Sequence, residues 1–317
     1  MRNSSIFSFD MKRFVCSIFL FFTLLGVGLV CACFYLPSRT VGQSMLVVQK
    51  AKIDWLSQIQ GARVILVGGS GLGMGMQTSR LAQELNRPVH NMGLHAGFGL
   101  IYQLGAVASM QLHRGDLVVV VPEYSNFDGE HCFGDQELVA VLVDILPEHR
   151  KYISLLHWMR LWRCVAKYGA SKIRRFFLRP KASTLDPSGG YDAYGDAIWN
   201  GLAPDARLVV PPAKRLSVKQ FSPVVLSYIR SYVDECREKG IRVILMPPAY
   251  QSCSYDRQVE YIQKVAQELK QNGTPFVAPP RRYRLDEKYF YDTPYHLNLL
   301  GRELRTKLMV EDIQRVL

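Results

Sequence analysis

Val64-Ile65-Leu66-Val67-Gly68-Gly69-Ser70-Gly71 is an apolar run that ends in a serine flanked by glycines. The run has the length and the β-branched composition of a fully buried strand, and the glycines that follow it predict a tight turn. A hydroxyl group presented on a turn after a strand is well placed to act as a nucleophile. We therefore expect residues 64–68 to form the first strand of a sheet, with Ser70 just beyond its carboxyl end.

Strand and helix signals alternate through the rest of the chain. Further strands are expected at residues 88–92, 116–122, 241–246 and 275–278, and helices at residues 79–85, 100–112, 223–239, 255–272 and 297–316. Apolar strands separated by helices predict a parallel sheet that helices cover on both faces. We expect an α/β fold, a flavodoxin-like three-layer sandwich with about five strands in the order 2-1-3-4-5. In such sheets the active site lies beyond the carboxyl ends of the strands, where Ser70, Gly93 and Glu123 fall.

A second chemical motif lies near the C-terminus, in Tyr291-Asp292-Thr293-Pro294-Tyr295-His296. A serine hydroxyl is weakly nucleophilic until an imidazole accepts its proton, and a carboxylate can hold that imidazole in the required tautomer. The sequence therefore predicts an acyl-transfer site with Ser70 as the nucleophile, His296 as the base and Asp292 as the orienting acid.

The ordered set of serine, glycine and histidine resembles the SGNH, or GDSL-type, hydrolase superfamily. Gly68-Gly69-Ser70 stands where that family has its nucleophile, and Asn91-Met92-Gly93 matches the glycine that helps to form its oxyanion hole. The chain looks most similar to the membrane-anchored branch that includes DltD and the AlgJ/AlgX-like proteins of cell-surface polymer modification. His296-Leu297-Asn298 followed by Gly301 is typical of that branch.

The resemblance implies an oxyanion hole built from the backbone N–H groups of Ser70 and Gly93, with Asn126 as a further donor. Three residues separate Asp292 from His296, whereas the superfamily usually has two. The function implied is that of a membrane-anchored serine esterase or O-acyltransferase acting on a cell-envelope glycan or polymer through an acyl-serine. The alternative is a non-catalytic SGNH-like scaffold or assembly protein that partners a membrane-bound O-acyltransferase.

The start of the chain predicts a membrane anchor. Residues 14–35 are an uncharged apolar run of 22 residues, preceded by Arg2, Lys12 and Arg13. About 20 apolar residues are enough to cross a bilayer as a helix, and the basic flank predicts a cytoplasmic N-terminus. We expect a cytoplasmic segment at 1–13, a single-pass anchor of the cytoplasmic membrane at 14–36, a connector helix within 37–60 and an extracytoplasmic domain at 61–317. A cleaved signal peptide, or a lipoprotein site at Cys33, is the alternative.

The net charge of +12 is concentrated in one part of the chain, residues 150–181, which we call the basic stretch. It contains ten Lys or Arg, no Asp or Glu, and six aromatic residues. We expect a helical insertion at about 128–220, whose basic amphipathic helix rests on anionic lipid or on an acidic polymer. An insertion packed on the domain with a solvated basic face is the alternative. The extracytoplasmic location argues against nucleic acid as a partner.

No cofactor and no metal are predicted. The glycine-rich run at 68–75 follows a strand, as a dinucleotide fingerprint does, but it fits neither GxGxxG nor the Walker A motif. The cysteines outside the anchor lack the CxxC spacing of zinc sites, and we expect three histidines outside the motif to be structural: His90, His95 and His131. The expected partners are the bilayer, a cell-surface polymer and a membrane-bound O-acyltransferase.

Overall fold

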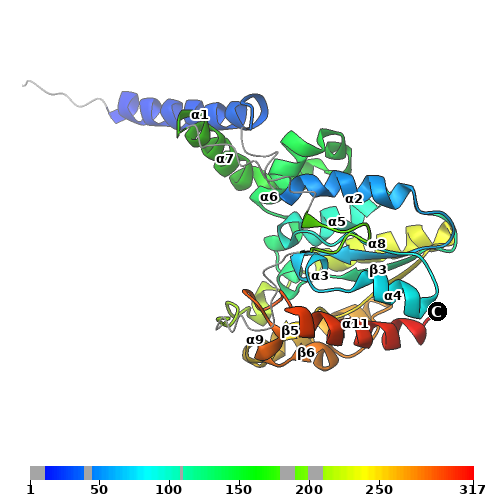
Figure 1. The fold of residues 1–317 in the computed structure, drawn as a ribbon. Coiled ribbons are helices and arrows are strands. Elements are labelled where there is room, and N and C mark those ends of the chain that lie inside the picture. Colours follow the sequence, from blue (N-terminus) through cyan, green and yellow to red (C-terminus); the bar gives the residue numbers. More distant parts are fainter. Residues whose placement is uncertain (1–10, 39–44, 108–109, 179–189, 199–209) are drawn as a thin grey trace, which may run out of the picture.

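The computed structural model describes residues 11–38, 45–107, 110–178, 190–198 and 210–317 (Figure 1). The strands are β1 Val64–Gly68, β2 Val89–Asn91, β3 Leu117–Val121, β4 Arg242–Leu245, β5 Tyr250–Gln251 and β6 Arg284–Leu285. The α-helices are α1 Met11–Tyr35, α2 Val48–Ser57, α3 Ser70–Gly73, α4 Thr78–Leu85, α5 Leu100–Val107, α6 Gln136–Ala140, α7 Leu155–Leu178, α8 Val224–Glu238, α9 Ser252–Arg257, α10 Val259–Gln271 and α11 Leu299–Gln314.

The central sheet is parallel and has the strand order β2-β1-β3-β4. The predicted order 2-1-3-4 is therefore confirmed, with four strands in place of about five. The segment expected as the fifth strand does lie beside β4, but it pairs there through a single bridge between Leu245 and Phe276. Ala278 leaves the extended conformation with a φ of 72°, and Pro279 has no N–H to donate. The ladder therefore stops after one bridge.

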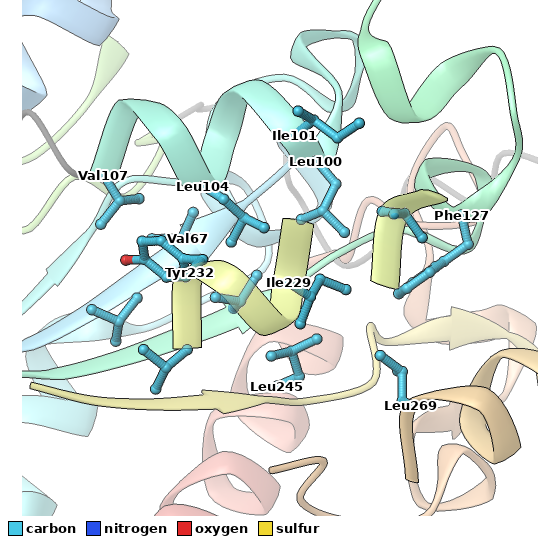
Figure 2. Close-up of a cluster of buried hydrophobic side chains, with 14 of the residues drawn as sticks. Val67, Leu100, Ile101, Leu104, Val107, Phe127, Ile229, Tyr232, Leu245 and Leu269 are labelled. Atoms are coloured by element: carbon cyan, nitrogen blue, oxygen red, sulfur yellow. The ribbon is translucent and has the colours of Figure 1, made fainter. Parts of the chain in front are cut away.

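Helices cover both faces of this sheet, as predicted. Alternate side chains of a strand point to opposite faces. Ile65 and Val67 of β1 pack with α5, α8 and α10, and Figure 2 shows Val67 in this layer beside Leu104 and Tyr232. Leu66 faces the other way, towards α4 and α11. Because both faces are buried, the strands are apolar throughout, which is why they were easy to recognise in the sequence.

Two local details differ from the prediction and shape the region near the site. The helix expected at 255–272 is divided into α9 and α10 at Gln258, which has φ −133° and ψ 25°. The buried Gln258 amide donates a hydrogen bond to the hydroxyl of Tyr250. Tyr250 belongs to a small parallel sheet, β5-β6, which was not predicted. This sheet lies beyond the end of β4 and supports the C-terminal motif.

Within the described residues, α1 is the one helix that is long and apolar enough to cross a membrane, with a mean hydropathy of 2.6 over its best window. These properties fit either an anchor or a signal sequence. The connector helix predicted within 37–60 is α2. It is part of the domain, because Leu56 and Lys52 are fully buried.

The predicted insertion is helical and centres on α7, which packs against α1 at one end of the molecule (Figure 1). Residues 179–181 of the basic stretch lie outside the described residues, as do 182–189 and 199–209 of the insertion. A described part of it, residues 190–198, returns to the domain. There the carbonyl of Tyr194 accepts a hydrogen bond from the N–H of Asn91 at 2.8 Å, so this segment lies along the edge strand β2.

Candidate active site

Ser70 is the first residue of α3, a single helical turn that follows β1 directly. The two residues beside it must be glycines, because neighbouring atoms leave no room for a side chain at either position. A Cβ atom on Gly69 would lie 2.6 Å from Oε1 of Glu123, and one on Gly71 would lie 2.9 Å from Cβ of Tyr295. The buried guanidinium of Arg305 donates to the carbonyl of Gly71 at 2.6 Å. The turn is therefore held from several sides, and the serine sits at the carboxyl edge of the sheet.

The structure brings Ser70, His296 and Asp292 into one hydrogen-bonded chain. Nε2 of His296 lies 2.8 Å from Oγ of Ser70, and Nδ1 lies 2.7 Å from Oδ1 of Asp292. The imidazole side chain is 14% exposed and the carboxylate 41%. The imidazole is thus shielded by protein on most of its surface, while the acid remains in contact with solvent.

A closed turn allows three residues to separate the acid from the histidine. The N–H of His296 donates to Oγ1 of Thr293 at 3.1 Å, and the N–H of Tyr291 donates to the carbonyl of His296 at 2.9 Å. Gln251 of β5 donates its N–H to the carbonyl of Pro294 at 3.1 Å. These bonds fold the segment back on itself, so the side chains of Asp292 and His296 face each other despite the longer spacing.

Tyr295 supports the same turn, and the sequence did not single it out for this role. Its ring stacks on Tyr250, with centroids 4.6 Å apart and an interplanar angle of 27°. Its hydroxyl accepts a hydrogen bond from the N–H of Tyr124 at 3.1 Å. Tyr295 therefore links the histidine turn to β5 and to the loop after β3. An aromatic residue directly before the histidine was the available signal.

Glu123 follows β3 at the carboxyl edge of the sheet, as expected, and lies against the nucleophile turn. Oε1 accepts from the N–H of Gly71 at a long 3.5 Å. Burial raises the pKa of Glu123 to about 7, and the Gly71 N–H and the Arg305 charge only partly oppose this effect. The carboxyl group is consequently neutral in mildly acidic solution and begins to ionise near neutrality.

Two of the predicted oxyanion donors are engaged inside the protein. The N–H of Gly93 donates to Oδ1 of Asn91 at 2.9 Å. The side-chain amide of Asn126 donates to the carbonyl of Ala96 at 3.1 Å, and its oxygen accepts from the N–H of Glu123 at 3.2 Å. Both groups would have to leave these partners to bind an oxyanion, so their assignment stays a prediction.

Ala96, which the sequence did not single out, lies close to the nucleophile turn. Its Cα would be 3.1 Å from a Cβ atom placed on Gly69, the residue before the serine. Ala96 is also the first residue of a short 3-10 helix, η3 (Ala96–Phe98), after an extended His95. The first N–H groups of a helix have no partner within it. The N–H of Ala96 is therefore a second candidate donor beside that of Ser70.

A buried polar network lies behind Gly93. Lys52 of α2 donates to the carbonyl of Gly93, and its ammonium lies 4.6 Å from the ring centroid of Tyr191. Asn91 donates its amide to Asp196 at 2.8 Å, and Asp196 also accepts two hydrogen bonds of 2.6 Å from Thr78. Lys52 falls on the buried face of α2 with Val48 and Leu56, a spacing that could have revealed it. The sequence offered no comparable signal for Asp196.

The insertion also touches the loop that carries Ala96. The N–H of Asp135, the N-cap residue of α6, donates to the carbonyl of Gly97 at 2.8 Å. The carboxylate of Asp135 lies where a Cβ atom on Gly97 would collide with it at 2.5 Å. The loop is therefore packed between the nucleophile turn on one side and the insertion on the other.

Three histidines outside the motif, at positions 90, 95 and 131, lie in different surroundings. Nδ1 of His131 lies 2.7 Å from Oδ2 of Asp128, which raises the pKa of His131. Burial lowers the pKa of His90 to about 4. Burial also lowers the pKa of His95, which is close enough to His296 for a charge there to lower it further. Across the described residues, His, Cys, Asp and Glu side chains form no group of three or more suited to a metal ion.

Comparison of the sequence with protein-family models gives no match, and no curated protein matches the chain either. Among solved structures, a GDSL-like lipase from Bacteroides thetaiotaomicron VPI-5482 aligns with 86% of this chain and 100% of its own, at 12% identity and a TM-score of 0.38. The protein YXIM of Bacillus subtilis aligns over 80% of this chain and 57% of its own, at 13% identity and a TM-score of 0.36. Both similarities are weak, and the chemistry of the site therefore follows from the geometry of this chain alone.

Proposed function

We propose that this protein is a membrane-anchored serine esterase or O-acyltransferase that works through an acyl-serine intermediate. The observation that carries the proposal is the hydrogen-bonded chain from Ser70 through His296 to Asp292 at the carboxyl edge of a parallel sheet. The strand order and the position of the serine after the first strand agree with the SGNH-like resemblance seen in the sequence.

The proposed chemistry follows from the orientation of the imidazole. With its Nδ1 proton directed at Asp292, His296 presents an unprotonated Nε2 to the hydroxyl of Ser70. As Oγ attacks an ester carbonyl, Nε2 accepts the hydroxyl proton and then passes it to the leaving alcohol. Asp292 stabilises the imidazolium that exists between these two transfers. Water or a sugar hydroxyl then attacks the acyl-serine, again with His296 as the base.

The proposed oxyanion hole contains the N–H groups of Ser70 and Ala96. The N–H of Ser70 belongs to the first residue of α3, and that of Ala96 to the first residue of η3, so both are helix-terminal donors. Loss of one such donor typically costs about 2.7–4 kcal/mol of transition-state stabilisation. Gly93, held between Lys52 and Asn91, would support this loop even if its own N–H does not reach the substrate.

The proposed substrate is an O-acylated glycan or related polymer of the cell envelope, and the proposed partner is a membrane-bound O-acyltransferase that supplies acyl groups. Both proposals come from the resemblance of Gly68-Gly69-Ser70 and His296-Leu297-Asn298 to the membrane-anchored branch. The proposed location is the cytoplasmic membrane, with the catalytic domain on its outer side. The apolar α1 supports a membrane anchor, and the orientation is inferred from the basic residues that precede it in the sequence.

Active-site labelling tests the proposal. The full-length chain in detergent should react with a fluorophosphonate probe at Ser70, because the probe requires an activated serine. Ser70→Ala should abolish labelling, whereas Ser125→Ala, which removes another serine near the same edge of the sheet, should not. A folded protein that does not react, or that reacts equally without Ser70, would favour the non-catalytic scaffold.

A further inference from the structure

One side of α7 is buried against the folded domain and against α1. A stripe of side chains along the helix is buried there: His157, Leu161, Val165, Tyr168 and Lys172. Polar contacts reinforce the packing, since the hydroxyl of Tyr168 donates to Asp144 at 2.6 Å and Lys172 donates to the same carboxylate at 2.8 Å. The helix is thus a rigid part of the domain, and its other side must face something else.

The outward side of α7 is divided lengthwise into two stripes. At about 100° per residue, one sector roughly 80° wide is apolar over the whole helix. We call it the apolar stripe: Leu155, Met159, Trp162, Ala166, Ala170, Ile173 and Phe177. The neighbouring sector, roughly 60° wide, holds Leu156 and Leu178 near its two ends and otherwise the basic stripe: Arg160, Arg163, Lys167 and Arg174.

Most of the apolar stripe is exposed, which is unusual for a soluble protein, while Ala166 and Ile173 are half-buried. Leu155 is 78% exposed, Trp162 61% and Phe177 75%. Single exposed apolar residues are ordinary, but a contiguous row of them marks a surface that meets a partner or a membrane. Between Leu155 and Leu178 there is no acidic residue that would balance the basic stripe. The face is therefore both apolar and positively charged.

The same helix lies directly against α1. Gly169 permits the contact, because a Cβ atom at that position would come within 2.0 Å of the carbonyl oxygen of Leu29. Lys172 donates to the carbonyls of Cys33 and Leu36 at 2.7 and 2.9 Å. Close approach at a small residue is characteristic of helices that pair in membranes. The crossing of the two helices is visible beyond the end of the domain (Figure 1).

The position of this contact sets the depth of α7. Leu29 lies seven residues before Leu36, so at about 1.5 Å per residue it is roughly 10 Å below the end of the apolar run. Trp158, near the start of α7, lies against Phe34 with ring centroids 6.0 Å apart, and Gly169 lies against Leu29, so α7 runs back along α1. The part of α7 from Gly169 onwards is therefore directed into the bilayer beside α1, while the long side chain of Lys172 reaches back to Cys33 and Leu36. In the same part, Phe177 points along the apolar stripe and Arg174 along the basic one.

We propose that α7 lies in the headgroup and upper acyl region of the bilayer leaflet on the side of the domain, against anionic phospholipid. The apolar stripe would enter the acyl chains, and the basic stripe would meet the phosphates, with long Arg and Lys side chains reaching outwards. Lipid is the occupant that fits this surface, because the stripe continues the apolar surface of α1 and the bordering charges are uniformly positive. This proposal does not depend on the proposed catalytic activity.

Photocrosslinking of the full-length chain in vesicles tests the proposal. Variants with benzoylphenylalanine in place of Trp162 or Phe177 would be reconstituted in phosphatidylcholine vesicles, with and without phosphatidylglycerol. A matched control variant would have benzoylphenylalanine in place of Val218, which is 41% exposed on a different part of the domain. We expect phospholipid adducts from positions 162 and 177 and none from position 218. The absence of lipid adducts at positions 162 and 177 would overturn the proposal. The same experiment in native membranes would also overturn it if these positions crosslinked to a protein and not to lipid.

The charge of the lipid is tested separately. Adducts at position 162 should be enriched in phosphatidylglycerol beyond its share of the vesicle, since each nearby cation can favour an anionic lipid roughly fivefold. The triple variant Arg163→Glu, Lys167→Glu, Arg174→Glu should lose this enrichment, and salt should weaken it in the unmodified chain. The control is the double variant Arg230→Glu, Arg237→Glu on α8, which should leave the phosphatidylglycerol enrichment unchanged. Enrichment that persists in the triple variant would refute the role of the basic stripe.

Discussion

The ammonium group of Lys52 is completely buried and donates a hydrogen bond to the carbonyl of Gly93. This bond joins α2, the helix that follows α1, to the loop that leads to Ala96. Burial lowers the pKa of Lys52 to about 7, and the charges of Asp196 and Asp192 oppose the effect only in part. The lysine is therefore close to losing its charge at neutral pH.

Replacement of this lysine should affect both stability and turnover. Lys52→Met leaves the carbonyl of Gly93 without its buried donor, at a cost of about 1–3 kcal/mol. Because the folded pKa is lower than the unfolded one, the contribution of Lys52 is fully present only at high pH and decreases as pH falls towards 7. The difference in Tm between the wild type and Lys52→Met should thus grow from pH 7 to pH 9. We expect a lower kcat with little change in KM.

Lys50→Met is the matched control for this experiment, because Lys50 lies on the exposed side of the same helix. It should leave Tm, kcat and the pH dependence unchanged. A Tm difference for Lys52→Met that does not vary with pH would contradict the assignment of a depressed pKa.

The contribution of Glu123 to stability changes with pH in the opposite direction to that of Lys52. Its folded pKa of about 7 is above the ordinary value of 4.5, so its stabilising contribution is present at low pH and is lost as pH rises through 7. Glu123→Gln cannot ionise and should gain stability relative to the wild type between pH 5 and pH 8, by at most about 3 kcal/mol. Urea unfolding at both pH values measures this. Glu130→Gln, at an exposed position, should show no such gain.

The acid and the base should differ in their contributions to rate. Asp292→Asn retains the shape of the side chain but favours the wrong tautomer of His296, and should lower kcat roughly 10³- to 10⁴-fold. His296→Ala removes the base and should lower kcat further. Each change combined with Ser70→Ala should cost little beyond Ser70→Ala alone, because the three residues act as a unit. Full activity of His296→Ala in ester hydrolysis would exclude the proposed mechanism.

Ala96→Pro tests the oxyanion donor that the structure suggests. Proline removes the N–H and is tolerated at the first position of a helix, and the preceding His95 is already extended with φ −147° and ψ 127°. We expect kcat to fall by about 10²- to 10³-fold with little change in Tm. Ala96→Ser keeps the N–H and should remain active. Comparable rates for the proline and serine variants would assign the oxyanion to other donors.

The topology predicted from the basic flank of the anchor is open to a direct test. Alkaline phosphatase fused after Leu317 should be active in cells, because it folds only after export. Deletion of residues 1–36 from the fusion should abolish that activity. A fusion to the complete chain that is inactive, with a cytoplasmic reporter active at the same position, would reverse the proposed orientation.

The sheet was readable from the sequence because its strands are short and apolar and are bounded by glycine, proline or charge. β1 and β3 follow the predicted limits closely, since burial on both faces requires local apolarity. The fifth strand was not readable in this way. Its pairing ends at Ala278, whose positive φ depends on surrounding packing and not on local composition.

Parts of the candidate site were predictable for a different reason. Ser70, Asp292 and His296 are chemically distinctive and lie at element boundaries, so their types and order suggested a common site. Lys52 and Asp196 are buried, and the groups that they contact come from segments far away in the chain. A single sequence records that a lysine is present but not that a carbonyl from another loop will accept a hydrogen bond from it.

The contact of Lys172 with Cys33 and Leu36 limits where the active site can work. By length alone, residues 37–47 could extend on the order of 35 Å and let the domain range widely above the bilayer. Because α7 joins the domain to the end of α1, that freedom is lost. The domain is then held at a fixed position relative to the end of α1. Under the proposed function, a polymer would be modified only close to the membrane surface, and chains deposited farther out would be beyond reach.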